Sequence, residues 1–166
     1  MKTIFLFSFL LICGCLSAQY AHSGKYIYTV PDKVVRMKYN AKRAIVPAVL
    51  SFVSGAAWGL HEVTAHHWPE FSRKFPKASP KFWNPALSWQ NKYVNWPEDK
   101  RRTAVPVFFT DSKHLLASTN QVFAFGAGVS IAIGERRPWW HYVADAGISF
   151  GAYTIGNAIT YDLLYR

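Results

Sequence analysis

Three long runs of this chain carry few or no charged residues, and their lengths fit helices. They cover roughly residues 44–61, 113–134 and 139–162. Each run is long enough for a short membrane span or for a fully buried helix. Pro47 lies near the start of the first run, where a helix tolerates proline. The pattern therefore predicts an all-α fold with three apolar helices.

The second and third predicted helices are separated only by the short turn 135–138. Two antiparallel helices joined by so short a turn are expected to pack on each other. Gly147 and Gly151 are four residues apart, which places them on one face of the last helix. Small residues let helices approach closely in lipid, so we expect these two glycines to line that contact.

The segment 69–103, between the first and second predicted helices, alternates prolines and aromatic residues with lysine and arginine. Its prolines prevent long helices. Aromatic rings and basic side chains both find partners at the surface of a membrane, so we expect this segment to be interfacial. Residues 19–43 are predicted to form a polar arm, and residues 44–166 a single membrane-associated helical domain.

Residues 1–18 have the pattern of a signal peptide. Lys2 precedes the apolar run Ile4–Ile12, which is too short to be a membrane span. Cleavage after Ala18 is the favoured processing route, and lipidation of Cys15 is the alternative. Both routes imply export to the cell envelope. The style of this leader resembles that of envelope proteins of the Bacteroidetes.

Composition and charge narrow the classes of function. Of all residues 51% are hydrophobic and 17% are charged, yet the formal net charge is +10. An exported chain rarely meets nucleic acid and no nucleic-acid module is visible, so anionic lipid head groups are the expected partner. A basic face that is merely solvated is the alternative. Both cysteines, Cys13 and Cys15, lie in the leader, which excludes an intrachain disulfide or a thiolate zinc site in the mature chain.

The candidate metal ligands are His61, Glu62, His66 and His67. Their spacing is not that of the zincin motif His-Glu-x-x-His, in which the histidines are four residues apart. It is closer to the His-x-x-x-x-His-His spacing of membrane-bound di-iron hydroxylases and desaturases, whose further histidine boxes are missing here. The alternative is that these histidines cap the end of the first helix and face head groups, since positive charge is favourable there.

A second group of polar residues marks the starts of the last two helices. Asp111, His114 and Ser118 have helical spacing, and steps of three and four residues bring side chains together on a helix surface. His141 and Asp145 are four residues apart in the last helix. An ionisable residue inside an otherwise apolar membrane helix is a candidate functional residue.

Two interpretations of this second group stay open. In the first, Asp111, His114 and Asp145 form a buried polar clasp between the last two helices. In the second, His114 is a general base that Asp111 or Asp145 orients, with Ser118 or a water molecule as the nucleophile. The protein would then be a membrane-embedded hydrolase or transferase that acts on lipid or cell-wall precursors. The first interpretation requires the three side chains to converge, and the second requires His114 to lie within hydrogen-bonding reach of Asp111 or Asp145.

The C-terminal part of the chain resembles the YfiM-like lipoproteins and, more distantly, the VanZ-like membrane proteins of bacterial envelopes. The resemblance covers about one third of the chain. The residues that carry it are Asp111, His114, Ser118, Gly126, Glu135, Asp145, Gly147 and Gly151. It implies a helical envelope protein and assigns no reaction, because the YfiM-like proteins have no established activity.

We therefore expect a small membrane-associated helical bundle that follows a cleaved signal peptide, with a structural or interaction role in the cell envelope. A compact soluble periplasmic bundle is the alternative architecture. The sequence indicates no particular cofactor or protein partner. Basic residues flank the first helix on both sides, so the charge distribution leaves the orientation in the membrane open.

Overall fold

The structure is a computed structural model that describes residues 38–166, which belong to one compact unit. The predicted signal peptide, the cleavage at Ala18, the lipidation of Cys15 and most of the predicted arm lie outside the described residues. The described chain is mostly helical. Its long helices are α3 (Ile45–His66), α7 (Ser112–Ala132) and α8 (Trp139–Tyr165), and the short 3-10 helix η1 (Ala41–Ala44) leads into α3.

The helices begin and end where local chemistry dictates. Asp111 caps the start of α7, because its carboxylate accepts a hydrogen bond from a backbone N–H in the first turn. Gly134 follows the end of α7 with φ +119°, a backbone conformation that favours glycine. Pro138 stands directly before α8, and its lack of an N–H costs nothing at a helix start. These residues fix the short turn that the sequence predicts.

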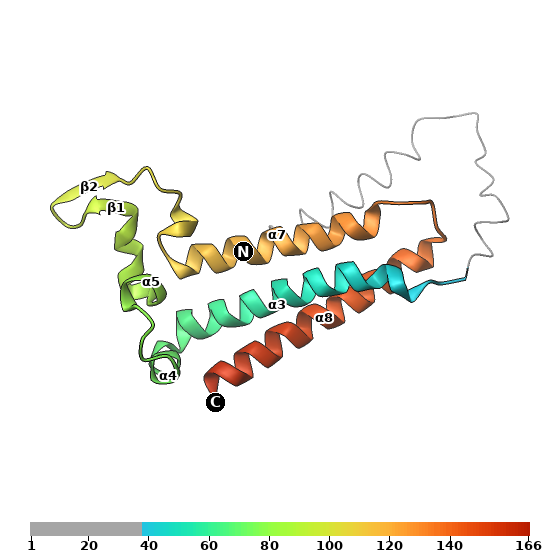
Figure 1. The fold of residues 1–166 in the computed structure, drawn as a ribbon, viewed down its shortest axis with the longest axis horizontal. Coiled ribbons are helices and arrows are strands. Elements are labelled where there is room, and N and C mark those ends of the chain that lie inside the picture. Colours follow the sequence, from blue (N-terminus) through green and yellow to red (C-terminus); the bar gives the residue numbers. More distant parts are fainter. Residues whose placement is uncertain (1–37) are drawn as a thin grey trace. The chain divides into compact units, whose positions relative to one another are not determined.

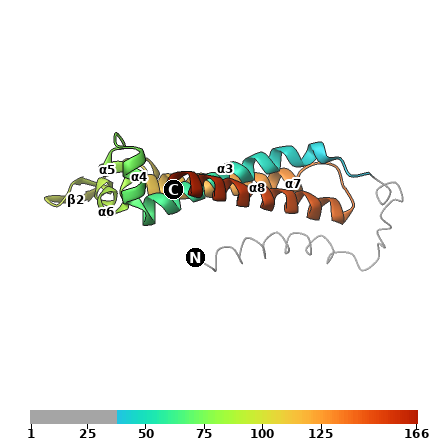
Figure 2. The ribbon, with the colours of Figure 1, turned by 90° about the horizontal axis from the view of Figure 1, so that it is seen from below.

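The three long helices are arranged around α3. Figure 1 shows α3 between α7 and α8, and Figure 2 shows the three helices lying in nearly one layer. α3 packs along both neighbours, whereas α7 and α8 contact each other over only a short stretch. The prediction that α7 and α8 pack on each other therefore holds only for that short stretch, and the main partner of each is α3.

Three glycines explain why α8 packs on α3. A Cβ atom on Gly55 of α3 would collide with the backbone carbonyl oxygen of Tyr153 in α8, and one on Gly156 of α8 would collide with that of Phe52. A Cβ on Gly59 would lie 2.6 Å from the backbone oxygen of Asn157. The two backbones are thus in direct contact, which only small residues allow.

The glycines that were predicted to line a helix contact, Gly147 and Gly151, do not do so. A Cβ atom on Gly147 or Gly151 would meet nothing within 4 Å, so these glycines face open space. The pair Gly55 and Gly59 on α3 has the same four-residue spacing and does line a close helix contact. The predicted kind of contact therefore exists, but it joins α3 to α8.

α3 and α7 are joined by hydrogen bonds instead. The Ser54 hydroxyl donates to the backbone carbonyl of Asn120 at 2.9 Å. In return, the Asn120 amide donates to the Ser54 carbonyl and hydroxyl oxygens, both at 3.0 Å. Since Ser54 is fully buried, this reciprocal pair satisfies polar groups that would otherwise be costly inside the bundle.

The segment between α3 and α7 is built from short elements. They are α4 (Trp68–Lys74), α5 (Pro80–Trp83), α6 (Pro85–Ser88), η2 (Trp89–Lys92), β1 (Tyr93–Asn95), β2 (Asp99–Arg102) and η3 (Val107–Phe109). β1 and β2 form a two-stranded antiparallel hairpin in which Tyr93 pairs with Arg102 and Asn95 with Asp99. This hairpin is a departure from the predicted all-α class, although the prolines prevent long helices here as expected.

Two helical segments of the described chain, Ala41–His66 and Ser112–Ala132, are long and apolar enough to cross a bilayer, judged by length and composition alone. α8 is longer but is not one of them. It contains the polar residues His141, Asp145 and Asp162. The prediction of three apolar helices is thus confirmed for two of them.

The contact between α3 and α8 generates a first prediction. Replacing Gly55 with Ala should force the two backbones apart and lower the free energy of unfolding by about 1–3 kcal/mol, the usual effect of overpacking. Thermal unfolding in uncharged detergent measures this. Gly151→Ala is the matched control, because its Cβ enters open space and alanine favours a helix. A larger loss for Gly151→Ala than for Gly55→Ala would contradict this packing.

Candidate functional site

The structure places the predicted site residues at opposite ends of the bundle. Asp111 and His114 lie at the start of α7, whereas His141 and Asp145 lie in the first turns of α8. α7 has 21 residues, so it separates the two groups by roughly 30 Å at 1.5 Å per residue. The predicted convergence of Asp111, His114 and Asp145 is therefore wrong, and the clasp of these three residues does not form.

Asp111 and His114 do form a pair. The Asp111 carboxylate accepts the backbone N–H of His114 at 2.8 Å, and the His114 Nδ1 lies 2.8 Å from both carboxylate oxygens. The Asp111 side chain is 2% exposed and that of His114 is 54% exposed. A buried carboxylate thus orients an imidazole that remains open to the surroundings. Among the described residues, no hydrogen bond joins Ser118 to His114.

Asp145 is the centre of a second polar group, which we call the end clasp and which consists of Tyr39, Arg137 and Asp145. Tyr39 donates its hydroxyl to Oδ1 of Asp145 at 2.6 Å, and Arg137 donates Nη1 to Oδ2 at 2.5 Å. Arg137 also donates Nη2 to the backbone carbonyl of Ile131, at the end of α7. The end clasp therefore ties the chain before α3, the end of α7 and the start of α8 together.

The two charged groups of the end clasp are buried, so their pairing matters for the stability of the fold. The side chains of Asp145 and Arg137 are 1% and 5% exposed, so each charge depends on the other. Burial and the hydrogen bond to the Asp145 carboxylate raise the pKa of Tyr39 to about 12. Tyr39 thus keeps its proton and donates throughout the physiological range of pH. The partners of Asp145 are therefore Tyr39 and Arg137, not the predicted Asp111 and His114.

The four candidate metal ligands do not form a metal site in this structure. Glu62 lies 3.7 Å from Nδ1 of His61 and 3.6 Å from Nε2 of His66. His67 turns away, and its Nε2 lies 2.8 Å from the hydroxyl of Tyr161 in α8. Within residues 38–166, no group of three or more His, Cys, Asp or Glu side chains is placed to hold a metal ion.

The histidines have structural contacts instead. His61 stacks on the Trp58 ring with the ring centroids 4.9 Å apart. His67 also packs edge-on against Tyr165, at 4.5 Å between the ring centroids. The hydrogen bond between Tyr161 and His67 and this ring contact join the ends of α3 and α8. His67 thus links α3 to α8 at this end of the bundle, as the end clasp links the helices at the other end.

His141 is buried next to the end clasp. It is 3% exposed, and its ring meets the edges of Tyr39 and Trp140, with centroids 5.4 Å and 4.0 Å away. Its Nε2 is buried and has no hydrogen-bond partner among the described residues. Most buried polar atoms in proteins have a partner, so this nitrogen calls for an explanation.

Sequence reasoning missed Tyr39 and Arg137. Tyr39 is 106 positions from Asp145 along the chain, and no local pattern connects them. Arg137 offered a signal, since it lies in the turn directly before the helix that carries the buried carboxylate. An isolated acid in an apolar helix requires a partner, and the nearest arginine in sequence was the first candidate to consider.

Comparison with known proteins adds no relative. The chain matches no protein-family model, no curated protein and no solved structure. The resemblance to YfiM-like and VanZ-like envelope proteins therefore stays a prediction from the sequence.

The end clasp generates a second prediction. Asp145→Ala leaves the buried Arg137 without its counter-charge, which should lower the free energy of unfolding by about 3–5 kcal/mol. Tyr39→Phe removes one hydrogen bond and should cost about 1 kcal/mol. Denaturant unfolding in detergent measures both. Asp162→Ala is the control, because it removes a carboxylate from an exposed position of the same helix. Equal losses for Asp145→Ala and Asp162→Ala would rule out a buried clasp.

Proposed function

We propose that this protein is a helical membrane protein of the bacterial cell envelope with a structural or interaction role. In this proposal α3 and α7 cross the bilayer and α8 packs against α3. The two ends of the bundle lie in the head-group regions. Placement in the envelope rests on the predicted signal peptide.

The observation that carries the proposal is the distribution of polar and apolar side chains. Large apolar residues on the long helices point outward; examples are Val122, Phe125 and Phe150, which are 67%, 75% and 73% exposed. The buried positions are mostly small or polar. The largest fully buried side chains are those of Val63, Thr64, Asp111, Asp145, Pro47, Ser54, Ser88 and Ser112. Exposed apolar surface of this extent is unfavourable in water and favourable in lipid.

The arrangement of the helices agrees with this distribution. A soluble domain normally packs two or more layers around one core, whereas these three helices lie in nearly one layer (Figure 2). Only 11% of the most apolar stretch of α7 is buried. In lipid such a layer needs no further cover, because contacts between small residues and hydrogen bonds hold the helices together. Within residues 38–166 the buried apolar residues are few, which speaks against the alternative architecture, a compact soluble bundle.

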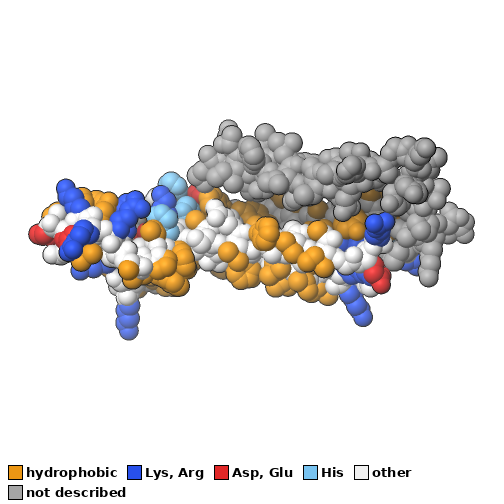
Figure 3. Space-filling view, turned by 90° about the horizontal axis from the view of Figure 1, so that it is seen from above, with side chains coloured by type: hydrophobic (Ala, Val, Ile, Leu, Met, Phe, Trp, Pro, Cys, Tyr) orange, Lys and Arg blue, Asp and Glu red, His pale blue; other side chains and the backbone are white. Residues whose placement is uncertain are grey.

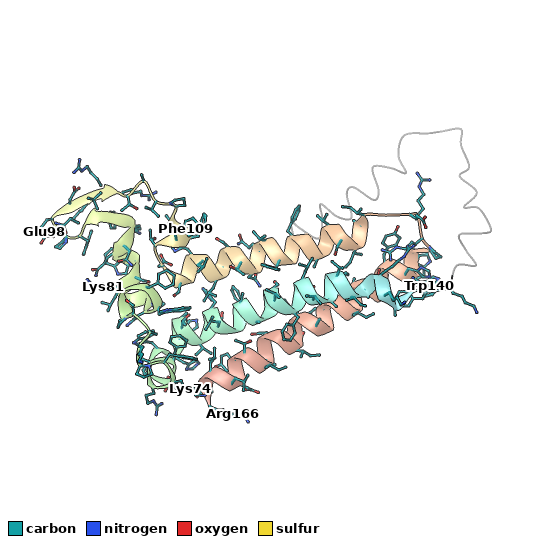
Figure 4. The ribbon with its side chains drawn as sticks, viewed as in Figure 1. Lys74, Lys81, Glu98, Phe109, Trp140 and Arg166 are labelled. Atoms are coloured by element: carbon teal, nitrogen blue, oxygen red, sulfur yellow. The ribbon has the colours of Figure 1, made fainter. Side chains whose placement is uncertain are left out.

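The lengths of α3 and α7 and the side chains at the two ends of the bundle also support a membrane location. α3 has 22 residues and α7 has 21, so each is about 30 Å long, the thickness of a hydrocarbon core. Figure 3 shows Lys and Arg side chains gathered at both ends of the described part, with hydrophobic side chains between them. Trp140 lies at one end, and Lys81, Glu98 and Phe109 lie at the other (Figure 4).

At the end of the bundle formed by the segment between α3 and α7, aromatic and basic side chains contact each other. Lys92 lies 5.2 Å from the ring centroid of Tyr93, and Lys100 lies 5.2 Å from that of Trp96. Trp89 packs against Trp96 with ring centroids 4.8 Å apart. Such clusters suit the head-group region, where rings meet the acyl boundary and amines meet phosphates. This supports the interfacial role expected for the segment 69–103.

The polar residues favour a structural role. In the end clasp the side chains of Arg137 and Asp145 are buried, Tyr39 is partly buried, and Asp145 accepts hydrogen bonds from both, which suits a group that holds helices together. One observation favours a catalytic role instead: Asp111 orients an exposed His114. A hydrolase or transferase that acts on lipid or cell-wall precursors would use the free Nε2 of His114 as a base toward water. Water is the nucleophile that this geometry favours over Ser118, since no hydrogen bond joins Ser118 to His114 within residues 38–166.

Membrane insertion generates a third prediction. With Cys13 and Cys15 replaced by Ser, Phe125→Cys in lipid nanodiscs should react with a water-soluble maleimide at least roughly tenfold more slowly than Glu98→Cys, because the hydrocarbon core excludes water. Glu98 lies in the exposed turn of the hairpin. Equal rates for the two variants would mean that Phe125 faces water, which would favour the soluble bundle.

A fourth prediction separates the structural role from catalysis. His114→Ala removes the ring that pairs with the buried Asp111 carboxylate but leaves the backbone N–H bond that caps α7, so the free energy of unfolding should fall by about 1–3 kcal/mol, less than for Asp145→Ala. In a deletion strain, this variant should restore resistance of the envelope to detergent, and Asp145→Ala should not. A His114→Ala protein that folds normally and fails to restore resistance would instead favour the hydrolase or transferase.

A further inference from the structure

A cavity of about 180 Å³ opens beside the end clasp. It is several times the volume of a single water molecule, which takes roughly 30 Å³ in the liquid. The cavity is lined by Lys38, Tyr39, Asn40, Arg43, Arg137 and His141. These residues come from the chain before α3, from η1, from the turn before α8 and from α8 itself.

The side chains that line the cavity are mainly hydrogen-bond donors, so they suit a ligand with acceptor atoms. They include one lysine and two arginines, all obligatory donors. Asn40 uses its side-chain oxygen to accept the Lys42 N–H, which leaves its amide NH₂ as the group available to a ligand. Two carboxylates lie nearby. Asp145 accepts hydrogen bonds from Tyr39 and Arg137, and Glu135 pairs with Arg43 at 3.5 Å in an exposed contact with which a ligand would compete.

His141 supplies the second, independent observation. It lines the cavity, it is 3% exposed, and its Nε2 has no hydrogen-bond partner within residues 38–166. A buried ring nitrogen without a partner is costly unless a ligand or water supplies one. The cavity is thus lined by three cationic side chains, two of them paired with carboxylates, and by a histidine whose Nε2 has no hydrogen-bond partner within residues 38–166.

We infer that this cavity binds a phosphate group. A phosphate offers several acceptor oxygens to donors on different sides, and arginine and lysine are its usual partners. The group could belong to a lipid head group or to a soluble phosphate. The cavity itself does not depend on membrane insertion, whereas a lipid source rests on the proposed function.

The test is a titration of the full chain, purified in uncharged detergent, with inorganic phosphate by calorimetry. Arg43→Gln should raise the Kd at least roughly tenfold, the usual effect of losing a charge-assisted hydrogen bond. Lys42→Gln is the matched control, because it removes the same charge from the neighbouring position, which does not line the cavity. Equal weakening by both variants would mean nonspecific attraction by charge and would overturn the inference.

A second measurement does not rely on variants. In protein labelled with ¹⁵N at histidine, phosphate should shift the Nε2 signal of His141 and leave that of His66 unchanged. His66 is the control because it is exposed and lies at the other end of α3. An unchanged His141 signal at saturating phosphate would overturn the inference, as would an absence of binding in every titration.

Binding measurements in lipid nanodiscs distinguish a phosphate of a lipid head group from a soluble phosphate. A preference for phosphatidylglycerol over phosphatidylcholine that Arg43→Gln abolishes would identify a lipid head group. Binding of inorganic phosphate without any lipid preference would identify a soluble phosphate. If Phe125→Cys labels rapidly and phosphate still binds, membrane insertion fails while the phosphate site stands.

Discussion

The close contact between α3 and α8 is the constraint on which the rest of the structure depends. At Gly55, Gly59 and Gly156 the two backbones touch, so the helices are fixed in register as well as in separation. The helices run parallel, and the start of α8 therefore lies beside the start of α3. This brings Tyr39, just before α3, within hydrogen-bonding distance of Asp145. The end clasp thus follows from the glycine contact.

The same contact determines the place of α7. Because α8 occupies the glycine face of α3, α7 packs on another face, where Ser54 and Asn120 exchange hydrogen bonds. The three helices then form a layer with little enclosed volume, and their bulky side chains point outward. A layer of this kind is stable where the surroundings are apolar, which is the physical basis of the proposed membrane location.

The sequence predicted the features that depend on local pattern. Runs without charge located the three helices, and the spacing of Asp111 and His114 correctly placed the imidazole next to the carboxylate. The pairing of helices could not be read in this way, because Gly147 and Gly151 have the same spacing as Gly55 and Gly59. Which pair is used depends on the partner surface, and that is a property of the whole fold.

One error was avoidable. Asp111 begins α7 and Asp145 lies near the start of α8, and two antiparallel helices joined by a short turn have their starts at opposite ends. The predicted convergence of Asp111 with Asp145 therefore conflicted with the predicted topology. The partnership of Asp145 with Tyr39, by contrast, spans 106 positions and depends on the contact between α3 and α8.

The most direct test of this account is a nuclear Overhauser measurement on the isotope-labelled protein in detergent micelles. If α8 packs on α3, the Hα protons of Gly156 should show cross-peaks to protons of Phe52 and Ala56, whose backbones they face. Cross-peaks from Gly147 or Gly151 to α7, with none from Gly156 to α3, would show that the last two helices pair directly and would contradict the account.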